Sequence, residues 1–225
     1  MSDDILINAT DVEKVYRVGK VDVPALRGVD LRVDSGEFLA IVGPSGSGKT
    51  TLLNLFGALD VPTGGELQVF GEHIAEMSKR ERADMRLHSM GFVFQAYNLV
   101  PVLTARENVE FVLELQGVGS ERRDRASEIL TELGLADLAD RRPNAISGGQ
   151  QQRVAVARAV ASRPRLVLAD EPTASLDGEN ARKLLEMMRR LNEDRGITFV
   201  FSTHDSRVVE YARRVVKLID GQVAE

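Results

Sequence analysis

Apolar residues recur along the chain in two different rhythms. Short continuous or alternating apolar runs, which are typical of strands, occupy residues 5–7, 11–16, 26–33, 37–42, 67–70, 91–94, 166–169, 197–201 and 215–219. Helical spacing or helix-forming charged composition predicts helices over residues 50–56, 79–88, 107–116, 122–133 and 179–194. Because strands of continuous apolar residues alternate with helices, we expect an α/β fold whose mostly parallel sheet is covered on both faces.

The middle of the chain departs from this alternation. From about residue 103 to 145 the spacing is helical and no strand signal is present. We therefore expect a single domain with a helical subdomain at about 96–160, inserted between core segments at about 1–95 and 161–225. In an open parallel sheet, ligands bind at the carboxyl ends of the strands.

Composition narrows the class of protein. The 225 residues include 43% hydrophobic and 28% charged residues, no cysteine, and a formal net charge of −5, so disulfides are excluded and no basic surplus points to nucleic acid. Residues 1–4 are acidic and do not resemble a signal peptide, and no apolar run approaches the ~20 residues of a membrane span. We expect a cytoplasmic chain with no direct membrane insertion, which reaches a membrane only through a partner.

The segment after the strand at 37–42 matches the phosphate-binding pattern G-x-x-x-x-G-K-[ST]. Its residues are Gly43, Pro44, Ser45, Gly46, Ser47, Gly48, Lys49 and Thr50. A strand before it and a helix after it are the context that this motif requires. Glycines let backbone N–H groups surround phosphate oxygens at a helix N-terminus, while the lysine reaches the outer phosphates and the Thr50 hydroxyl ligates Mg²⁺.

Two carboxylates end the apolar strand at 166–169. Taken alone, Asp170 and Glu171 are better interpreted as solvated acids that open a loop. With a P-loop in the same chain, Asp170 is expected to hold Mg²⁺ through water. The adjacent Glu171 is then placed to orient or deprotonate an attacking water.

A second phosphate-binding pattern precedes the Ala-rich helix predicted from residue 151. Ser147, Gly148, Gly149 and Gln150 place a hydroxyl and two glycine N–H groups at a helix N-terminus, which predicts an anion site. A simple serine helix cap explains the same residues.

Together these segments resemble the motifs of the nucleotide-binding subunit of ABC (ATP-binding cassette) transporters, over essentially the whole chain. In order along the chain, the matching motifs are Walker A at 43–50, the Q-loop glutamine Gln95, the signature at 146–150, Walker B at 166–171, the D-loop at 175–177 and the switch histidine His204. The signature begins with Ile146 in place of the usual Leu, a swap that conserves volume and apolarity. The resemblance implies a P-loop (RecA-like) core with an N-terminal antiparallel β region and an inserted helical subdomain.

The resemblance also implies how the site works. Two copies pair head to tail, and ATP on the P-loop of one copy is capped by the signature of the other. Nucleotide contacts are then expected from the P-loop residues, Thr51, Gln95, Ser147, Gly148, Gly149, Gln150, Asp177 and His204. Thr50, Gln95 and Asp170 would form the Mg²⁺ shell, and Glu171, His204, Lys49 and Gln95 would carry out hydrolysis. Tyr16 is expected to stack on adenine, and its alternative is an ordinary half-buried strand tyrosine.

The partner and the branch of the family are implied by the same resemblance. A membrane permease is expected to dock near residues 96–105, although internal packing of the helical subdomain also explains the apolar residues there. Residues 21–29, 92–95, 107–109 and 169–173 resemble the branch of lipoprotein-releasing and macrolide-export ATPases, whose close relatives include a cell-division ATPase. The alternative is therefore an ABC-type ATPase that regulates a cell-division or signalling complex. A different P-loop enzyme, such as a nucleotide kinase, leaves residues 147–150 unexplained.

Overall fold

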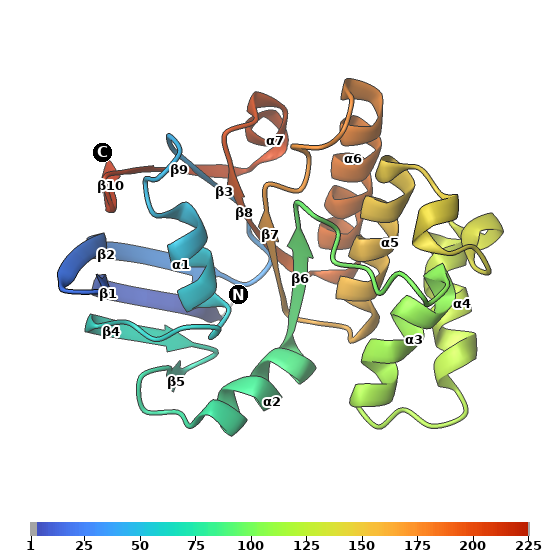
Figure 1. Ribbon diagram of the computed structural model, residues 1–225, viewed down its shortest axis with the longest axis horizontal. Helices are drawn as coiled ribbons and strands as arrows, with labels where there is room; N and C mark the ends of the chain where they lie inside the picture. The colour runs from blue at the N-terminus through green and yellow to red at the C-terminus, as the bar shows by residue number, and fades with distance from the viewer. Residues whose placement is uncertain (1–3, 225) are drawn as a thin grey trace.

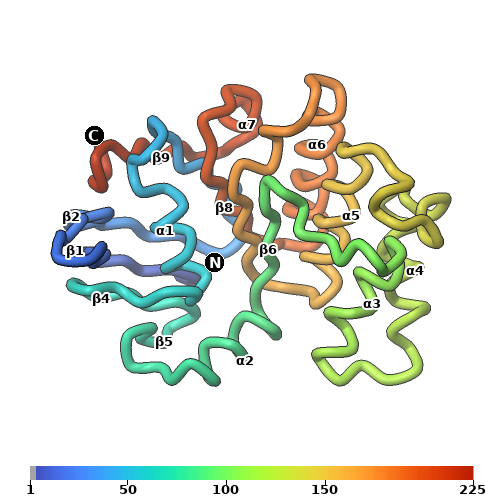
Figure 2. The backbone as a smooth tube through the Cα atoms, viewed as in Figure 1, coloured from blue at the N-terminus to red at the C-terminus, as the bar shows by residue number. Residues whose placement is uncertain are grey.

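The computed structural model describes residues 4–224. Residues 1–3, which belong to the acidic N-terminal segment, and residue 225 lie outside the described residues. The described chain contains two sheets with helices around them, and the predicted α/β class is confirmed. Figure 1 shows the antiparallel sheet at one side, the parallel sheet in the middle and α3, α4 and α5 at the opposite side. The tube in Figure 2 shows the N-terminal strands far from the helices of the middle segment.

The larger sheet has six strands in the order β10-β9-β3-β8-β7-β6. Its members are β3 (Phe38–Val42), β6 (Met90–Phe94), β7 (Leu166–Asp170), β8 (Thr198–Thr203), β9 (Arg214–Ile219) and β10 (Gln222–Ala224). All neighbouring pairs are parallel except β9 and β10, which form an antiparallel hairpin. The sequence analysis did not anticipate β10, which is only three residues long.

The smaller sheet is antiparallel, in the order β2-β1-β4-β5. Its strands are β1 (Ile5–Val18), β2 (Val21–Asp34), β4 (Gly64–Val69) and β5 (Glu72–His73). The separate strands predicted at 5–7 and 11–16 were wrong, because β1 is continuous with register shifts on both sides of Val12. Asp11 has a positive φ of 49° there, and its N–H donates to Asp30 Oδ1 at 2.8 Å, so the polar residues mark a bulge.

The helices are α1 (Lys49–Phe56), α2 (Lys79–Ser89), α3 (Ala105–Leu115), α4 (Arg122–Glu132), α5 (Gly148–Ala161), α6 (Gly178–Arg195) and the short α7 (Ser206–Tyr211). Three of them begin with a reciprocal capping box. The side chain of Ser78, Thr104 or Ser147 accepts a hydrogen bond from the backbone N–H three residues on, and the side chain of that residue accepts one from the backbone N–H of the cap. Between residues 96 and 160, all of which the structure describes, helices and turns are found and no strand. The sequence analysis did not anticipate α7.

The parallel sheet buries both of its faces, which explains its continuous apolar strands. In β3, Phe38 and Ala40 pack into a cluster with residues of α3, α5 and α6. The alternate residues Leu39 and Ile41 pack into a second cluster with α1 and the antiparallel sheet. A one-residue shift in register would exchange these two sets, so the packing determines where each strand ends.

Helix α5 lies directly against β6. A Cβ atom added to Gly91 would be 2.3 Å from the backbone oxygen of Ala159, a distance that real Cβ atoms do not reach. The helix and the strand therefore touch backbone to backbone near the start of β6.

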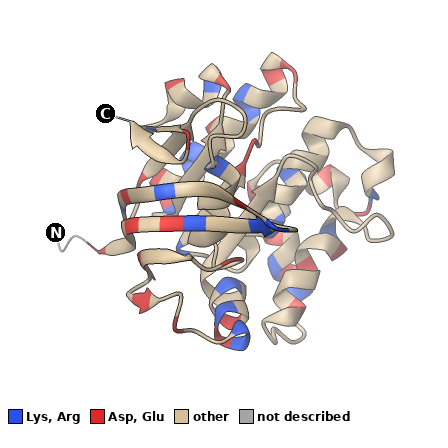
Figure 3. Cartoon of the chain, turned by 60° about the vertical axis from the view of Figure 1, so that its left-hand side comes forward, with Lys and Arg blue, Asp and Glu red and all other residues tan. Residues whose placement is uncertain are grey.

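Charges of both signs are mixed on the surface. In the view of Figure 3, Lys and Arg alternate with Asp and Glu along the strands and helices. Within residues 4–224, no helix has both the length and the apolar character that crossing a membrane requires.

Replacing Gly91 by alanine should destabilise the fold. Because the added methyl group meets backbone oxygen, we expect the free energy of unfolding to fall by about 1–3 kcal/mol, measured by urea denaturation. Gly119→Ala is the matched control, since no atom lies within 4 Å of the position of its Cβ. Equal stability of the two variants would contradict the close approach of α5 to β6.

Candidate functional site

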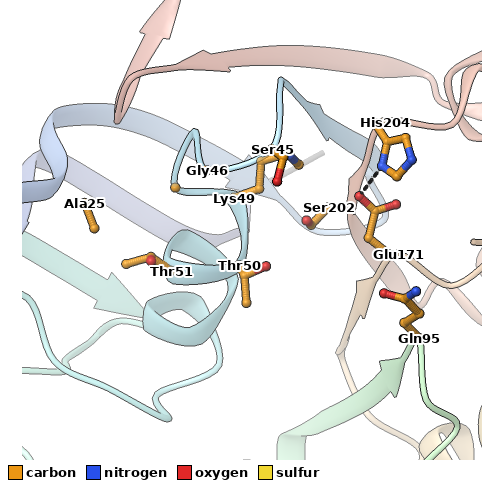
Figure 4. Close-up of a pocket in the computed structure, with 11 residues that line it drawn as sticks. Ala25, Ser45, Gly46, Lys49, Thr50, Thr51, Gln95, Glu171, Ser202 and His204 are labelled. Atoms are coloured by element: carbon orange, nitrogen blue, oxygen red, sulfur yellow. Dashed lines mark hydrogen bonds and ion pairs between the residues drawn. The ribbon is translucent and has the colours of Figure 1, made fainter.

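Four strand ends and one loop surround a pocket. Strands β3, β8, β7 and β6 are adjacent and parallel, so the residues that follow them gather at one edge of the sheet. The pocket at this edge has a volume of about 420 Å³. It is lined by Ala25, Ser45, Gly46, Gly48, Lys49, Thr50, Thr51, Gln95, Glu171, Ser202 and His204, as Figure 4 shows.

The loop after β3 places backbone donors at the start of α1. Gly46 and Gly48 have positive φ angles of 81° and 99°, a conformation that favours glycine. No side chain among the described residues caps α1, so the first N–H groups of this helix are left for a ligand. Lys49 is 7% exposed, and its Nζ donates to the carbonyl oxygens of Gly43 and Pro44 at 2.8 and 2.9 Å. The buried ammonium group is thus satisfied by the loop itself.

A hydrogen bond between two side chains joins the start of helix α1 to the end of strand β7. The Thr50 hydroxyl donates to the carboxylate of Asp170, with distances of 3.1 Å to Oδ2 and 3.3 Å to Oδ1. Phe94, the residue before Gln95, pairs with Asp170 across β6 and β7. Oxygen atoms of a hydroxyl, a carboxylate and an amide are therefore available at one edge, and oxygen ligands are those that Mg²⁺ prefers.

Glu171 is held in an uncommon backbone conformation. Its φ is 47°, and its N–H donates to the backbone oxygen of Ser202 at 2.9 Å. One carboxylate oxygen lies 2.7 Å from Nδ1 of His204, and the other accepts from the Thr203 hydroxyl at 3.2 Å. Left-handed backbone at a non-glycine residue persists only where its surroundings hold it, and here three residues of the β8 end do so.

The residue after His204 ties the β7 and β8 ends together. Asp205 Oδ2 accepts from the Thr173 hydroxyl at 2.5 Å and from Nη2 of Arg207 at 2.7 Å. Burial favours the neutral form of Asp205, but the hydrogen bonds from Arg207 and Thr173 outweigh it and lower its pKa to about 2.

The segment at 147–150 lies elsewhere in the chain's own fold. Ser147 is the N-cap of α5: its hydroxyl accepts from Gln150 N–H at 3.3 Å, and Gln150 Oε1 accepts from Ser147 N–H at 2.8 Å. None of these four residues lines the pocket. The segment therefore forms a capped helix start outside the pocket of its own chain.

Asp177 also caps a helix and contacts the segment at 147–150 through Asn180. Its carboxylate accepts from the backbone N–H of Asn180 at 2.9 Å and from the Asn180 amide at 2.7 Å, which lower the pKa of Asp177. A Cβ at Gly149 would lie 2.7 Å from the Asn180 side chain, so a larger residue there would displace Asn180.

Tyr16 does not line the pocket but is held beside it. Its hydroxyl donates to Asp60 at 3.0 Å, and the Lys14 ammonium lies 4.9 Å from its ring centroid. Lys14 also donates to Asp60 at 2.7 Å. Burial, followed by the contact with Asp60, raises the pKa of Tyr16.

Comparison with known proteins assigns the chain to a family. The family model described as ABC transporter matches residues 26–174. The chain belongs to the ABC transporter family. It is an ABC-type ATPase, which confirms the family and the activity predicted from the sequence motifs.

Named relatives of this ABC ATPase differ in length. The macrolide export ATP-binding/permease protein MacB of Syntrophobacter fumaroxidans is 45% identical over 97% of this chain, but the chain spans only 31% of that relative. An uncharacterized ABC transporter ATP-binding protein of Thermotoga maritima is 48% identical, with 97% of this chain and 93% of the relative covered. A solved structure of the ATP-binding cassette MJ0796, a protein of Methanocaldococcus jannaschii, has a TM-score of 0.90 and 43% identity, covers 97% of each chain, and is described as dimeric and bound to ADP and Pi.

The structure of this ABC ATPase brings about half of the predicted site residues into the pocket lining and leaves the others outside it. The pocket contains Ser45, Gly46, Gly48, Lys49, Thr50, Thr51, Gln95, Glu171 and His204. Outside its lining are Tyr16, Gly43, Pro44, Ser47, Asp170, Asp177 and the segment at 147–150. Two lining residues were missed, Ala25 and Ser202. Ser202 is fully buried, and its Oγ has no hydrogen-bond partner among the described residues. Its place directly before Thr203 and His204 on an apolar strand was the signal that would have found it.

The Asp205 contacts should make the stability of this ABC ATPase depend on acid pH. The carboxylate has a lower pKa in the folded chain than its ordinary value of 3.8, so its stabilisation is complete above pH 4 and is lost as pH falls toward 2. Asp205→Asn should lower the free energy of unfolding by roughly 1–2 kcal/mol at pH 7 and by less at pH 3. Urea denaturation at both pH values measures this difference. Asp194→Asn, an exposed acid at the end of α6, is the control, and a deficit of equal size at both pH values would contradict the assignment.

Proposed function

We propose that this chain is the ATP-hydrolysing subunit or domain that dimerises on ATP and powers a membrane permease partner in the export or extrusion of lipoproteins, peptides or drugs. One observation carries the proposal. The P-loop and Glu171 gather at a single pocket, beside Asp170, which accepts from the Thr50 hydroxyl of its lining, while the second phosphate-binding segment at 147–150 lies outside that pocket. A chain that carries both halves of a phosphate clamp in separate places requires a second copy to close it.

The nucleotide occupies the pocket with its phosphates at the P-loop. The backbone N–H groups of Gly46 to Thr50 contact the phosphates, and Lys49 exchanges its two carbonyl partners for phosphate oxygens. Tyr16 stacks on adenine from strand β1 of the antiparallel sheet, held by Lys14 and Asp60.

The oxygen donors at the strand ends fit Mg²⁺. Thr50, Gln95 and Asp170 would hold the ion, directly or through water, together with the phosphates. Among residues 4–224, no group of three or more His, Cys, Asp or Glu side chains forms a metal site by itself, so a metal would depend on the nucleotide. When bound, Mg²⁺ neutralises charge that develops on the phosphates.

Hydrolysis rests on the contact between Glu171 and His204. Glu171 accepts a proton from the attacking water or orients it, and its left-handed backbone directs the carboxylate toward the pocket. His204 holds that carboxylate and contacts the γ-phosphate, and Gln95 reaches the same space from β6. Positioning and electrostatics lower the barrier in phosphoryl transfer, with little covalent chemistry by the protein.

The second copy supplies the cap. Ser147, Gly148, Gly149 and Gln150 of one copy contact the nucleotide of the other, and Asp177 couples the two sites. ATP closes the dimer because the γ-phosphate bridges both copies, and hydrolysis removes that bridge.

The permease docks near residues 96–105. A groove of about 510 Å³ lies there, bordered by β6, α2, α3 and the loop after Gln95. Its lining includes exposed apolar residues of α3, Phe111 at 44% and Leu115 at 56% exposure, which fit an apolar helix end of a partner.

The chain would then work on the cytoplasmic face of the membrane as one ABC domain, with a core of about 1–95 and 161–225 and a helical subdomain of about 96–160. An ABC-type ATPase that regulates a cell-division or signalling complex uses the same site.

Glu171→Gln should separate binding from hydrolysis. The variant keeps the shape of the side chain but accepts no proton, so we expect ATP binding close to the parent's and turnover reduced by at least about 100-fold. Gel filtration with ATP and Mg²⁺ should show accumulation of a dimer. Turnover at the parent's rate would show that Glu171 is not the base.

Mixing two inactive variants tests the composite site. Lys49→Ala damages the P-loop and Ser147→Arg blocks the cap, so each variant alone should show almost no ATPase activity. In a mixed dimer one site combines the intact P-loop with the intact cap. An equal mixture should therefore regain activity, up to about a quarter of the parent rate if dimers form at random. No recovery in a mixture shown to contain mixed dimers would rule out capping by the second copy.

A further inference from the structure

A single buried amide joins three functional segments. Gln152 lies on the second turn of α5 and is 0% exposed. Its Nε2 donates to the backbone oxygen of Pro172 at 2.9 Å and to that of Phe94 at 3.2 Å. Pro172 directly follows Glu171, and Phe94 directly precedes Gln95.

Gln152 contributes through its amide nitrogen. Gln152 Oε1 is buried and has no hydrogen-bond partner among the described residues. An unsatisfied buried oxygen costs free energy, so what this side chain supplies lies in its two donor bonds. The two donor bonds therefore point to a function in holding the two carbonyl groups in place.

The rest of α5 packs against the same strand. The backbone of Ala159 lies so close to Gly91 that a Cβ atom there would be 2.3 Å from the Ala159 oxygen. Arg158, whose pKa is lowered by burial, donates to the backbone oxygens of Tyr97 and Asn98 in the loop after Gln95. Both of these loop residues have positive φ angles, 58° and 51°, so the loop is held in a strained form.

The start of α5 touches this loop as well. A Cβ at Gly148 would lie 2.7 Å from the Tyr97 hydroxyl oxygen. A displacement of the segment at 147–150 is therefore felt by the loop that carries Gln95, and through Gln152 by the turn that carries Glu171.

We propose that Gln152 is a positioning residue that makes the two nucleotide sites of a dimer cooperative. The inference rests on the proposed function, in which residues 147–150 cap the nucleotide of the second copy. When that nucleotide seats the start of α5, Gln152 draws the carbonyl groups beside Gln95 and Glu171 into the arrangement that hydrolysis needs in its own copy. Coupling of this kind requires a physical link between two sites, and the amide bonds supply it.

Asn192 provides a matched control. It is also a buried amide, 3% exposed, whose Nδ2 donates to the backbone oxygens of Gly36 and Ile197 at 2.9 and 2.7 Å, and its Oδ1 is unpartnered among the described residues. Its bonds join segments that enter β3 and β8, at the end of the sheet away from the pocket.

The test compares Gln152→Met with Asn192→Leu in the full chain. ATPase rates against ATP concentration give the Hill coefficient and kcat, and thermal denaturation gives stability. We expect the parent to have a Hill coefficient between 1 and 2, and Gln152→Met to fall to about 1 with kcat reduced at least about fivefold. ATP binding to the dilute single chain should be unchanged. Asn192→Leu should lower the melting temperature and keep the parent's Hill coefficient.

A second variant removes the donor group and keeps the length of the side chain. Gln152→Glu keeps the length and the oxygen but has no amide donor, and it should lose cooperativity in the same way. A parent-like Hill coefficient in either folded Gln152 variant, an equal loss in Asn192→Leu, or a non-cooperative parent overturns the proposal. A parent that hydrolyses no ATP would instead refute the proposed function.

Discussion

Parallel pairing of β3, β8, β7 and β6 is the constraint on which the site depends. Gln95, Asp170, Glu171 and His204 lie at or directly after strand ends, so their positions are set by register. Asp170 pairs with Ser202, and Phe94 pairs with Asp170. That register is in turn set by the two apolar clusters on either face of the sheet. The geometry of the pocket is therefore a property of the hydrophobic core as much as of the polar residues that line it.

Part of the backbone strain of the chain lies at the same edge. Glu171, Tyr97 and Asn98 are non-glycine residues with positive φ angles, and each lies shortly after β6 or β7. Hydrogen bonds from neighbouring segments hold them: Ser202 accepts from Glu171 N–H, and Arg158 donates to both loop carbonyls. Strain of this kind persists where surrounding structure over-determines the backbone, and it is common at functional sites.

The sequence predicted the fold class and most of the pocket, because both arise from local patterns. Apolar runs mark buried strands, and glycine, lysine and acidic residues mark the loops that come after these strands. Prediction failed where tertiary contacts decide. The polar pair Thr10 and Asp11 indicates a break in the local pattern, whereas pairing with β2 on one side and β4 on the other carries the strand through it. The local pattern shows Gln152 only as a polar residue of an Ala-rich helix. Its two carbonyl partners are 58 and 20 residues away in the sequence, so no local signal points to them. Ser202 was missed because it lies within an apolar strand, although it directly precedes Thr203 and His204.

The contacts of Lys49 have a thermodynamic consequence. Its ammonium group is already withdrawn from water and rests on two carbonyl oxygens of its own loop. Dehydration of this cation is thus completed when the chain folds, and a ligand has only to replace neutral dipoles by anionic oxygens. The exchange favours multiply charged ligands over neutral ones. Because the Lys49 side chain is already ordered, little of its conformational entropy is left to be lost when a ligand binds. The loop is therefore preorganised for ligand binding.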